Sequence, residues 1–581
     1  MSGRAAKLLA SAAVAANLLP AALLFYFVHR FGVDVPWRDD WYGFLTPLQQ
    51  FDQGTLGFSA LFAQHMEHRP LFPRLLSLAN AVLFHWNRTV EMYVTAALLV
   101  FCACLLFRFV RAYWAHPLTP ILFLPMAWTL LSWRQWQNLL WAFQTCFGLL
   151  AAGAVLAFCL LHRARGADRV LLIAVAAAFV ASFSLAGGLL IWPVGLAQLL
   201  LQRLCAEPDD GPRPGAFVVW TSAGTLTWAL FFVGHHEPPE VGVWPTGFGY
   251  LIHNSVATAR FLATMIGSPL SWNQPTAQSL GIIMTALGAW TVFRLLRKTR
   301  DLAAAVPLLS LMALILINVV LICDRRMGIN GTIQALNSRY CTLMMLGLVA
   351  LYALLTRLAL TERSPATLLA CGGMAALLVS GAITNFISWR DDAIAQWYLH
   401  MEVIGKYAVR YADVVSDEGL SYLEADPPMM REAIPFLRAH RYTLFHQTAP
   451  MGVPASYTGS AGGCNIEAVN HRGGTVIDVD LRKDSSGLQV EGWALDLAEE
   501  RVPGRVFVSI DGRIDVPAVP GGDRPDVARF FKNPNYGTAG FVSFVRTSLL
   551  TVGEHTLELK IVNQDGTGYW TCGASRLRVA E

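Results

Sequence analysis

The first two thirds of this 581-residue sequence contain few charged residues. Residues 1–387 carry 25 basic and 15 acidic side chains, whereas residues 388–581 carry 19 and 25. With 54% hydrophobic residues in the whole chain, the first part is too apolar for a soluble protein, and the last third has an ordinary soluble composition. This excludes a purely soluble enzyme and a disordered chain. The sequence also lacks the basic stripe of a nucleic-acid-binding protein, so nucleic acid is excluded as a partner.

Three further absences narrow the function. No Walker-type or dinucleotide-binding glycine loop is present, so nothing supports the use of ATP or a nucleotide sugar. The ten cysteines form no CxxC motif. Eleven long apolar runs contain no Asp, Glu, Lys or Arg in their interiors, although ion-coupled transporters usually need ionisable groups at mid-membrane depth. We therefore expect any chemistry to occur at a membrane surface.

The eleven apolar runs predict helices that cross a bilayer core of about 30 Å. They are residues 8–28, 92–107, 117–131, 139–161, 170–186, 189–201, 217–234, 277–293, 302–322, 341–355 and 366–387. Residues 250–267 are a weaker candidate because they include His253, Asn254 and Arg260. We interpret that segment as an interfacial or re-entrant helix. The fold class is thus a mainly α-helical polytopic membrane protein, with a bundle over residues 1–387.

Loop charges predict the orientation of this bundle. If the N-terminus is cytoplasmic, the short inner loops hold 15 Lys and Arg residues, and the much longer outer loops hold 10. This distribution follows the positive-inside rule. An odd number of spans then places the C-terminal part on the outer side. The first run is too long for a typical signal peptide and more spans follow, so we expect an uncleaved anchor.

The first outer loop, over about residues 29–91, is too long for a simple connection. It contains an acidic pair, Asp39 and Asp40, between Trp37 and Trp41. A carboxylate at headgroup level could accept a proton from a sugar hydroxyl while a lipid-linked partner stays in the membrane. The alternative is an aromatic belt with solvated acids, which is common at membrane interfaces.

The same loop contains a second polar segment with His65, Glu67, His68 and Arg69. We favour a role in positioning a substrate for Glu67, His68 and Arg69. His65 and His68 could share a helix face and bind a metal, but two histidines and one glutamate are weak evidence for a metal site. A plain alternative is a polar cap before the amphipathic stretch 70–85.

Amide and aromatic side chains open the fourth predicted span. Gln137, Trp141 and Gln144 are spaced to lie on one helix face, with Asn138 beside them. Such a polar stripe is costly in a bilayer unless it lines a wet cavity or packs inside the bundle. Contact with a substrate and hydrogen bonding between helices are equally compatible with this pattern.

Three arginines follow the ninth predicted span in what we expect to be an outer loop. Arg325 and Arg326 are adjacent, and Arg339 precedes Tyr340. Guanidinium groups beside a headgroup region suit bidentate recognition of phosphate. Lipid phosphate and a bound polyprenyl phosphate would both provide that partner.

The C-terminal part has a different pattern. We expect residues 388–474 to be a helical and loop connector, with 452–484 loop-like, and residues 475–581 to form a soluble β-sandwich. Period-two alternation in residues 488–490, 506–510, 541–545 and 557–561 predicts strands, and Asp511-Gly512 predicts a hairpin turn. Cys464 and Cys572 are the only cysteines here, and an oxidising compartment would permit their pairing. No nucleophile–base signature is visible, so binding or spacing is the default role.

Together these features resemble the GT-C superfamily of membrane glycosyltransferases, in which an acidic first outer loop, a multi-span bundle and a soluble outer domain occur together. The resemblance extends to poorly characterised bacterial members and rests on Trp37-Arg38-Asp39-Asp40-Trp41, Glu67-His68-Arg69, Trp136-Gln137-Asn138, Phe143-Gln144 and Ser338-Arg339-Tyr340. The tail segments Glu491-Gly492-Trp493-Ala494-Leu495-Asp496 and Arg524-Pro525-Asp526-Val527 are similar to a β-domain of bacterial glycan-related proteins.

The resemblance implies an inverting transfer of a sugar from a polyprenyl-phosphate donor to a glycan or lipid acceptor. It places the protein in the bacterial inner membrane, with its active site and C-terminal domain in the periplasm. By match to the acidic motif, Asp39 is the expected base and Asp40 a near-equal candidate. Arg339, with Arg325 or Arg326, would stabilise the leaving phosphate.

Two matters stay open in this family assignment. Some members use a divalent metal such as Mg²⁺ or Mn²⁺ and others do not, and this sequence shows no convincing ligand set. Two other functions are also compatible with the sequence. One is a transporter or flippase for a lipid-linked glycan, against which the uncharged spans argue, and the other is a non-catalytic scaffold that binds glycan through the β-domain.

Overall fold

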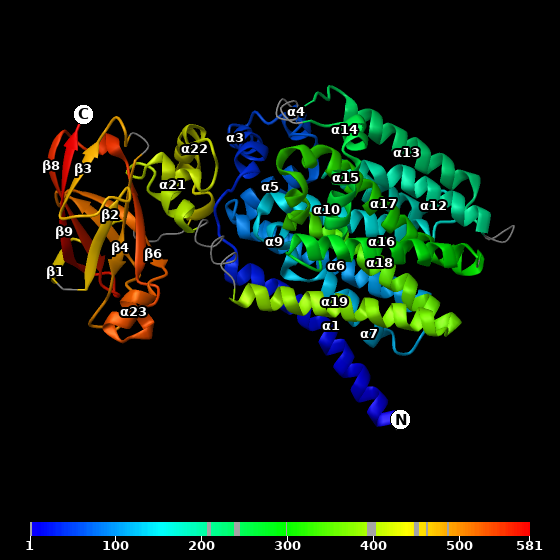
Figure 1. Cartoon of the computed structure of the whole chain (residues 1–581). Coiled ribbons are helices and arrows are strands. Elements are labelled where there is room, and N and C mark those ends of the chain that lie inside the picture. The colour runs from blue at the N-terminus through cyan, green and yellow to red at the C-terminus, as the bar shows by residue number, and fades with distance from the viewer. Residues whose placement is uncertain are drawn as a thin grey trace. The chain divides into compact units, whose positions relative to one another are not determined.

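The chain forms two compact units (Figure 1). The computed structural model describes residues 3–205, 211–237, 245–297, 299–391, 403–446, 452–460, 463–484 and 487–581. The first unit comprises Met1–Gly32, Tyr42–Asn80 and Thr89–Asp392. The second unit comprises Val33–Trp41, Ala81–Arg88 and Ala393–Glu581. Two short segments of the predicted first outer loop therefore fold with the C-terminal part of the chain.

Within the described residues of the first unit and its borders, nine helical stretches are long and apolar enough to cross a membrane. They are α1 (Gly3–Phe31), α6 (Arg88–Trp114), η2 with α10 (Ala142–Gln144 and Thr145–Leu161), η3 with α12 (Ala186–Leu190 and Ile191–Cys205), α13 (Pro214–Phe232), α16 (Gln274–Leu296), α17 (Thr299–Asn330) with η5 (Gly331–Leu336), α18 (Ser338–Glu362) and α19 (Pro365–Asp391). This confirms a multi-pass helical bundle.

The predicted count of eleven spans is not confirmed. Residues 117–131 form two short helices, α7 (Thr119–Leu122) and α8 (Leu124–Leu130), each with a proline in its first turn. Proline is favourable in the first turn of a helix but interrupts a continuous one, so this apolar run divides. Residues 170–186 form α11 (Arg169–Ser182), which has only 14 residues.

Burial shows which helices lie at the centre of the bundle. In α18, 83% of the most apolar window is buried, and in the η2–α10 stretch 78%. The corresponding share is only 28% in α1, α13, α16 and α19. A helix that is apolar on all sides yet exposed in the protein itself is suited to contact with lipid. These four helices therefore form the periphery of the first unit.

Shorter helices connect the spans. They are α2 (Asp39–Gly43), α3 (Leu45–Asp52), α4 (Phe58–Phe62), α5 (Leu71–Phe84), η1 (Trp133–Gln135), α9 (Trp136–Leu140), α14 (Phe248–His253) and α15 (Ser255–Gly267). The amphipathic stretch expected over 70–85 is the helix α5. The interfacial segment expected over 250–267 is the helix pair α14 and α15, and its relation to the bilayer stays a prediction.

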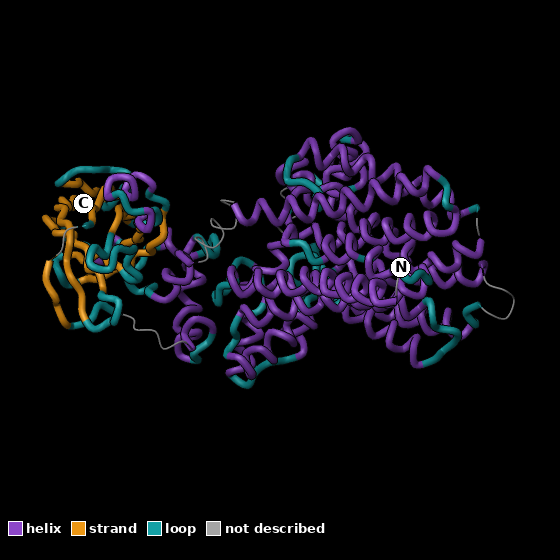
Figure 2. Tube along the Cα trace, turned by 90° about the horizontal axis from the view of Figure 1, so that it is seen from below, coloured by secondary structure: helices purple, strands orange, loops and turns teal. Residues whose placement is uncertain are grey.

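The C-terminal part of the second unit begins with helices and ends in a sheet. The named helices are α21 (Asp417–Ser421), α22 (Pro427–Ala439), η6 (Thr443–His446), α23 (Pro525–Phe531), η7 (Pro534–Tyr536) and η8 (Thr547–Leu549). Helices occur in residues 403–446 of the predicted connector, and residues 392–402 and 447–451 lie outside the described part. In Figure 2 the strands gather near the C-terminus.

In the described part of the second unit, nine strands form one hydrogen-bonded sheet in the order β1-β9-β8-β5-β6-β7-β4-β2, and β3 also pairs with β9. They are β1 (Ser456–Ser460), β2 (Cys464–Val469), β3 (Val476–Asp480), β4 (Leu488–Ala494), β5 (Val506–Ile510), β6 (Ile514–Gly522), β7 (Gly540–Val545), β8 (Gly553–Val562) and β9 (Gly568–Ala580). The strand-rich domain is confirmed, and the sandwich arrangement stays a prediction.

Local signals located the strands β4, β5, β7 and β8 but not the other strands. All four alternating segments are strands, and Asp511 and Gly512 both have positive φ in the turn between β5 and β6, as the hairpin prediction requires. The loop-like prediction for residues 452–484 is wrong. It contains β1, β2 and β3, which pair with the distant strands β9 and β4. The sheet thus begins before the predicted boundary at residue 475.

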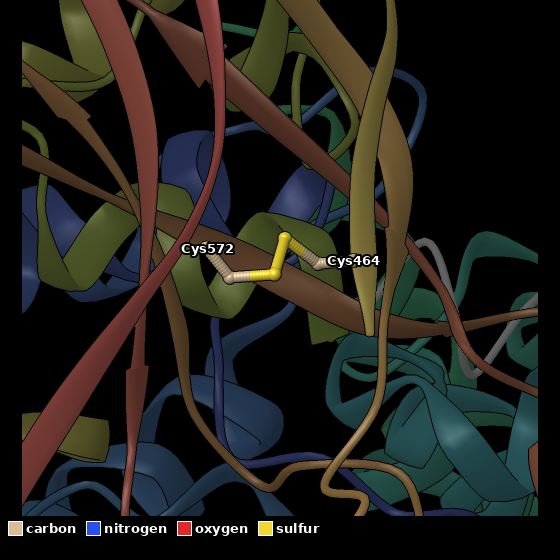
Figure 3. The surroundings of a disulfide bond; sticks show 2 residues. All are labelled: Cys464 and Cys572. Atoms are coloured by element: carbon tan, nitrogen blue, oxygen red, sulfur yellow. A yellow bond between two sulfur atoms is a disulfide. The ribbon is translucent and has the colours of Figure 1, made fainter. Parts of the chain in front are cut away.

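A disulfide joins Cys464 at the start of β2 to Cys572 in β9 (Figure 3). The two residues are 108 positions apart in the sequence, and their Cα atoms are 6.0 Å apart. This confirms the pairing that the composition permitted. The bond closes a loop that contains most of the sheet, which favours the folded state by restricting the unfolded chain.

We expect the double substitution Cys464→Ala and Cys572→Ala to lower the free energy of unfolding of the second unit by about 2–5 kcal/mol. The measurement is the denaturant midpoint for proteolysis of the full-length protein. Cys104→Ala, which changes an exposed unpaired cysteine, is the control. Equal midpoints for the double variant and the control would contradict a stabilising role for the bond.

Candidate functional site

The predicted acidic pair begins helix α2, and its two members have different surroundings. The Asp40 carboxylate accepts a hydrogen bond from the Trp37 backbone N–H at 3.1 Å and another from Nη2 of Arg88 at 2.6 Å. Asp40 is 1% exposed and Arg88 is fully buried. Asp39 is half-buried. The two acids are therefore not equivalent, because one is enclosed in a charge pair and the other reaches the surface.

A small network holds this charge pair inside the second unit. The Arg88 backbone N–H donates to Oδ1 of Asp34 at 2.8 Å, and Oδ2 of Asp34 lies 3.6 Å from Nδ1 of His446. The Arg88 guanidinium lies 4.7 Å from the centre of the Trp86 ring. These contacts join three segments that are far apart in the sequence. They fix the backbone of the segment that contains Asp39.

Burial determines the acidity of the enclosed carboxyls. Burial raises the pKa of Asp40, and the charge and hydrogen bonds of Arg88 act in the opposite direction. Burial also raises the pKa of Asp34, against the opposing effects of Arg88, Lys406 and His446. Both shifts have the sign expected when water is removed from around a carboxylate.

The alternative of an aromatic belt with solvated acids is wrong for Trp41 and Asp40. Trp41 is 1% exposed, and so is Asp40. A tryptophan of an interfacial belt would present its ring to the headgroups, and a solvated acid would not be enclosed. Trp37, by contrast, is half-buried. This segment is thus packed into the protein on the Trp41 side.

The polar segment around Glu67 belongs to the first unit and is a tight turn. His65 and His68 exchange backbone hydrogen bonds of 2.8 and 2.9 Å, and Met66 has a positive φ. The expectation that His65 and His68 share a helix face is therefore wrong. Among the described residues, no group of three or more His, Cys, Asp or Glu side chains is arranged to hold a metal ion.

Glu67 forms an ion pair with a predicted arginine. Its carboxylate lies 2.8 Å from Nη2 of Arg326 and 3.8 Å from Nε2 of His68. Burial opposes ionisation of Glu67, but His68, Arg326 and Arg325 outweigh it and lower the pKa of Glu67 to about 2. The structure thus brings Glu67, His68 and Arg326 together, although the two segments are 259 positions apart.

We expect Glu67→Gln to destabilise the first unit by about 2–3 kcal/mol at pH 7, because the pKa of Glu67 falls from 4.5 to about 2 on folding. A carboxyl whose pKa is lower in the folded state stabilises the fold at pH values above its unfolded-state pKa. This stabilisation is lost as the pH decreases toward 2. The difference in unfolding midpoint between wild type and variant should therefore shrink from pH 7 to pH 3. A difference independent of pH would contradict the ion pair.

Arg69 has contacts that account for its burial without a substrate. Its guanidinium donates to the backbone carbonyls of Phe231 at 2.6 Å, of Phe62 at 2.8 Å and of Val233. Two of these carbonyls lie at the end of α13, where helix carbonyls lack intrahelical partners. The role of Arg69 in orienting a substrate stays a prediction, but these bonds give it a structural role.

Arg325 and Arg326 are not in a loop, as the sequence had suggested. The helix α17 continues to Asn330, so both arginines lie within the helix, before its last turn. Arg325 is 40% exposed and lies 3.2 Å from Glu237 and 3.6 Å from Asp324. Glu237 is 69% exposed, so its pair with Arg325 is weak, whereas Asp324 is buried. Arg325 can therefore exchange Glu237 for an anionic ligand.

The amide stripe of the fourth span is interrupted. Trp141 has an extended backbone between α9 and η2, so Gln137 and Gln144 do not share a continuous helix face, and that prediction is wrong. Gln144 is buried, and its Oε1 has no hydrogen-bond partner in the described structure.

Gln137 and Asn138 instead hold the beginning of α18. Oε1 of Gln137 accepts from the Arg339 backbone N–H at 3.0 Å, and Nδ2 of Asn138 donates to the Arg339 carbonyl at 2.8 Å. Oγ of Ser338 accepts from the Gln137 backbone N–H at 3.0 Å. Two motifs about 200 positions apart are thus side by side, with Arg339 fixed between two amide side chains.

The side chains at this junction differ in exposure. Arg339 is half-buried and lies 5.3 Å from the centre of the Tyr340 ring. Tyr340 is buried, and its hydroxyl has no hydrogen-bond partner in the described residues. A fixed backbone with a partly accessible guanidinium suits a residue that must present a charge in one place.

Sequence reasoning did not identify Arg134 or Arg88. Arg134 is fully buried, donates to the carbonyls of Ser268 and Leu336 at 2.9 Å each, and lies 3.6 Å from the centre of the Trp272 ring. The available signal was an arginine directly beside a predicted span, because such a residue needs an internal partner if it does not reach water.

The predicted site residues thus form three groups. The first unit contains Glu67, His68 and Arg326 in one group and Gln137, Asn138 and Arg339 in another, while Asp39 and Asp40 belong to the second unit. No family model matches the sequence, and neither a curated protein nor a solved structure matches it. The residues themselves are therefore the basis for a functional proposal.

Proposed function

We propose that this protein is a membrane glycosyltransferase of the GT-C type that moves a sugar from a polyprenyl-phosphate donor to a glycan or lipid acceptor. The proposed location is the bacterial inner membrane, with a cytoplasmic N-terminus and periplasmic chemistry. The helical bundle supports membrane embedding, and the motifs that resemble the superfamily support the reaction. The fold class alone would not identify a function.

The observation that carries the proposal is the difference between the two acids. A general base must reach the proton that it removes. Asp40 is enclosed with Arg88 at 2.6 Å and is 1% exposed, so it is suited to a structural role. Asp39 is half-buried at the start of α2. We therefore assign the base to Asp39 and a positioning role to Asp40.

The proposed reaction is a single displacement. Asp39 removes the proton of the acceptor hydroxyl while that oxygen attacks the anomeric carbon of the donor sugar. The bond between this carbon and the phosphate oxygen breaks, and the polyprenyl phosphate leaves with the bonding electron pair. The configuration of the sugar is inverted. The proton then passes from Asp39 to water, which restores the carboxylate.

Arginines are proposed to stabilise the leaving phosphate. Arg339 is fixed at its backbone by Gln137 and Asn138, and Arg325 is 40% exposed with the exposed Glu237 as one of its partners. Charge-assisted bonds from guanidinium groups stabilise negative charge as it develops on a phosphate oxygen. Arg326 is engaged with Glu67, so we assign it to holding the loop that contains Glu67 and His68.

The test uses full-length protein in vesicles of its own membrane lipids, with a panel of polyprenyl-phosphate hexoses that carry a radiolabelled sugar. We expect the label to enter a new linkage, with one polyprenyl phosphate released for each sugar transferred. Movement of the intact labelled donor across the bilayer, without release of polyprenyl phosphate, would contradict the proposal and indicate a transporter.

A further inference from the structure

An apolar cavity of about 460 Å³ lies within the first unit, between α16, α17 and α18. It is lined almost entirely by apolar side chains, including Met284, Met312 and Met344, and by two glycines, Gly288 and Gly347. Its volume is in the range of about 300–1,000 Å³ that is typical of ligand sites. Methionines and glycines give such a cavity an adaptable wall that can follow a flexible chain.

The cavity extends from the middle of the bundle to one of its ends. On α16 its lining runs from Met284 to Leu296, the last residue of the helix, a distance of about 18 Å at 1.5 Å per residue. The long axis therefore matches that of an acyl chain that enters from one membrane surface and reaches the bilayer centre.

A positively charged residue lies beside the end of the cavity that is near Leu296. Phe293 lines the cavity, and the Arg297 guanidinium lies 4.1 Å from the centre of its ring. Arg297 is exposed, and no carboxylate among the residues that the structure describes pairs with it. The neighbouring Arg294 is already paired with Glu362 at 2.5 Å. Arg297 is therefore available to pair with an anionic ligand at this end of the apolar cavity.

We infer that this cavity binds one acyl chain of an anionic phospholipid, with the lipid phosphate paired to Arg297. An apolar lining suits the chain, and a guanidinium suits the phosphate. Basic positions between membrane helices on the cytoplasmic side are known recognition sites for anionic headgroups. The positive-inside pattern places Arg297 on that side, where such lipids contact the protein.

This site is separate from the proposed reaction centre. Arg297 precedes α17, and Arg339 lies just beyond the end of that helix and of η5. A 32-residue helix is about 48 Å long, so Arg297 and Arg339 lie at opposite ends of it. The bound lipid would therefore occupy the leaflet opposite to the one in which the donor reacts, and would act as a structural or regulatory ligand.

Native mass spectrometry of full-length protein tests the inference, after release from nanodiscs of phosphatidylglycerol or phosphatidylcholine with identical acyl chains. We expect wild type to retain one phosphatidylglycerol, with a preference of at least tenfold over phosphatidylcholine. Gly288→Leu should reduce retention at least tenfold. An added Cβ at Gly288 meets only the flexible end of Met312, at 3.7 Å, so the fold should tolerate this change.

Arg297→Gln should abolish the preference for the anionic lipid without preventing retention of a chain. Two matched controls separate the site from general lipid contact. Gly373→Leu adds the same side chain on α19 where nothing lies within 4 Å, and Arg363→Gln removes an exposed arginine just after α18. The inference would be overturned if Gly288→Leu and Gly373→Leu reduced lipid retention equally. It would also be overturned if Arg297→Gln and Arg363→Gln had the same effect on the preference for phosphatidylglycerol. In nanodiscs of phosphatidylglycerol that also contain polyprenyl phosphate, preferential retention of the polyprenyl phosphate would overturn it as well.

Discussion

Arg88→Met is expected to destabilise the second unit by about 3–5 kcal/mol, one of the two largest effects that we predict. The substitution leaves the Asp40 carboxylate buried without its partner, and an uncompensated buried charge is costly. Asp40 and Arg88 are 1% and 0% exposed, so water cannot replace the lost contact. The midpoint of unfolding, followed by proteolysis of the full-length protein in denaturant, measures the effect.

The pH dependence of this variant identifies the cause. Burial raises the pKa of Asp40, and Arg88 is the main opposing influence. Without Arg88 the pKa of Asp40 should increase further, so ionisation of Asp40 in the folded variant becomes more costly. A group with a raised pKa stabilises the fold at low pH and loses that effect as the pH increases. The deficit of Arg88→Met should therefore be larger at pH 8 than at pH 5.

A double substitution provides the control for the buried pair. Asp40→Leu combined with Arg88→Met removes both charges and keeps apolar volume, which is often neutral or stabilising for a buried pair. We expect the double variant to be more stable than Arg88→Met alone. A double variant less stable than both single variants would contradict the account of an isolated buried charge pair.

Asp39→Asn is expected to lower the turnover number of sugar transfer by about 10²–10⁴, the usual contribution of a general base. The amide has the size of the carboxylate but cannot accept the proton of the acceptor hydroxyl. Because Asp39 is half-buried and not enclosed like Asp40, the stability of the protein should change little. The measurements are initial rates of transfer at saturating donor and the unfolding midpoint of the same preparations.

Two companion variants make the prediction specific. Asp39→Glu keeps a carboxylate at a shifted position and should retain part of the activity. Asp413→Asn changes a surface acid of the same unit that is 76% exposed, and should stay within about twofold of wild type. Full activity of Asp39→Asn would remove the base from the proposed mechanism. Loss of activity together with loss of folding would assign Asp39 a structural role.

The sequence predicted the bundle well because the length of a membrane span is a local property. The apolar runs 341–355 and 366–387 lie within α18 and α19. The predictions were wrong where a local feature interrupted such a run. Prolines divide residues 117–131 into α7 and α8, and an extended Trp141 divides α9 from η2. Periodicity alone does not reveal an interruption by one residue.

The strands also divide into those that could be predicted from their own residues and those that depend on pairing with a distant strand. Alternation of apolar residues let β5 and β8 be predicted from their own residues, although every residue of β5 is buried. The strands β1 and β3 owe their conformation to pairing with β9, which is about 100 positions away. The strand β1 has no aliphatic residue and therefore no period to detect, whereas β3 does alternate exposed and buried residues and was missed.

The sequence predicted which residues belong to the candidate site but not which of them contact one another. The acids, amides and arginines were identified because their motifs resemble a known superfamily. Their partners were not, because Arg88 lies 48 positions from Asp40 and Gln137 about 200 from Arg339. The distinction between Asp39 and Asp40 depends on burial, which a pair of adjacent, chemically identical residues does not encode.

The central claim is that the segment around Asp39 lies at the donor sugar during transfer. A polyprenyl-phosphate sugar with a photoreactive diazirine on the sugar ring tests it most directly, by mapping the peptides labelled in the full-length protein. We predict adducts in the segment around Asp39, suppressed by excess unmodified donor. Adducts confined to the strands β4–β9 of the second unit, with none near Asp39, would contradict the claim.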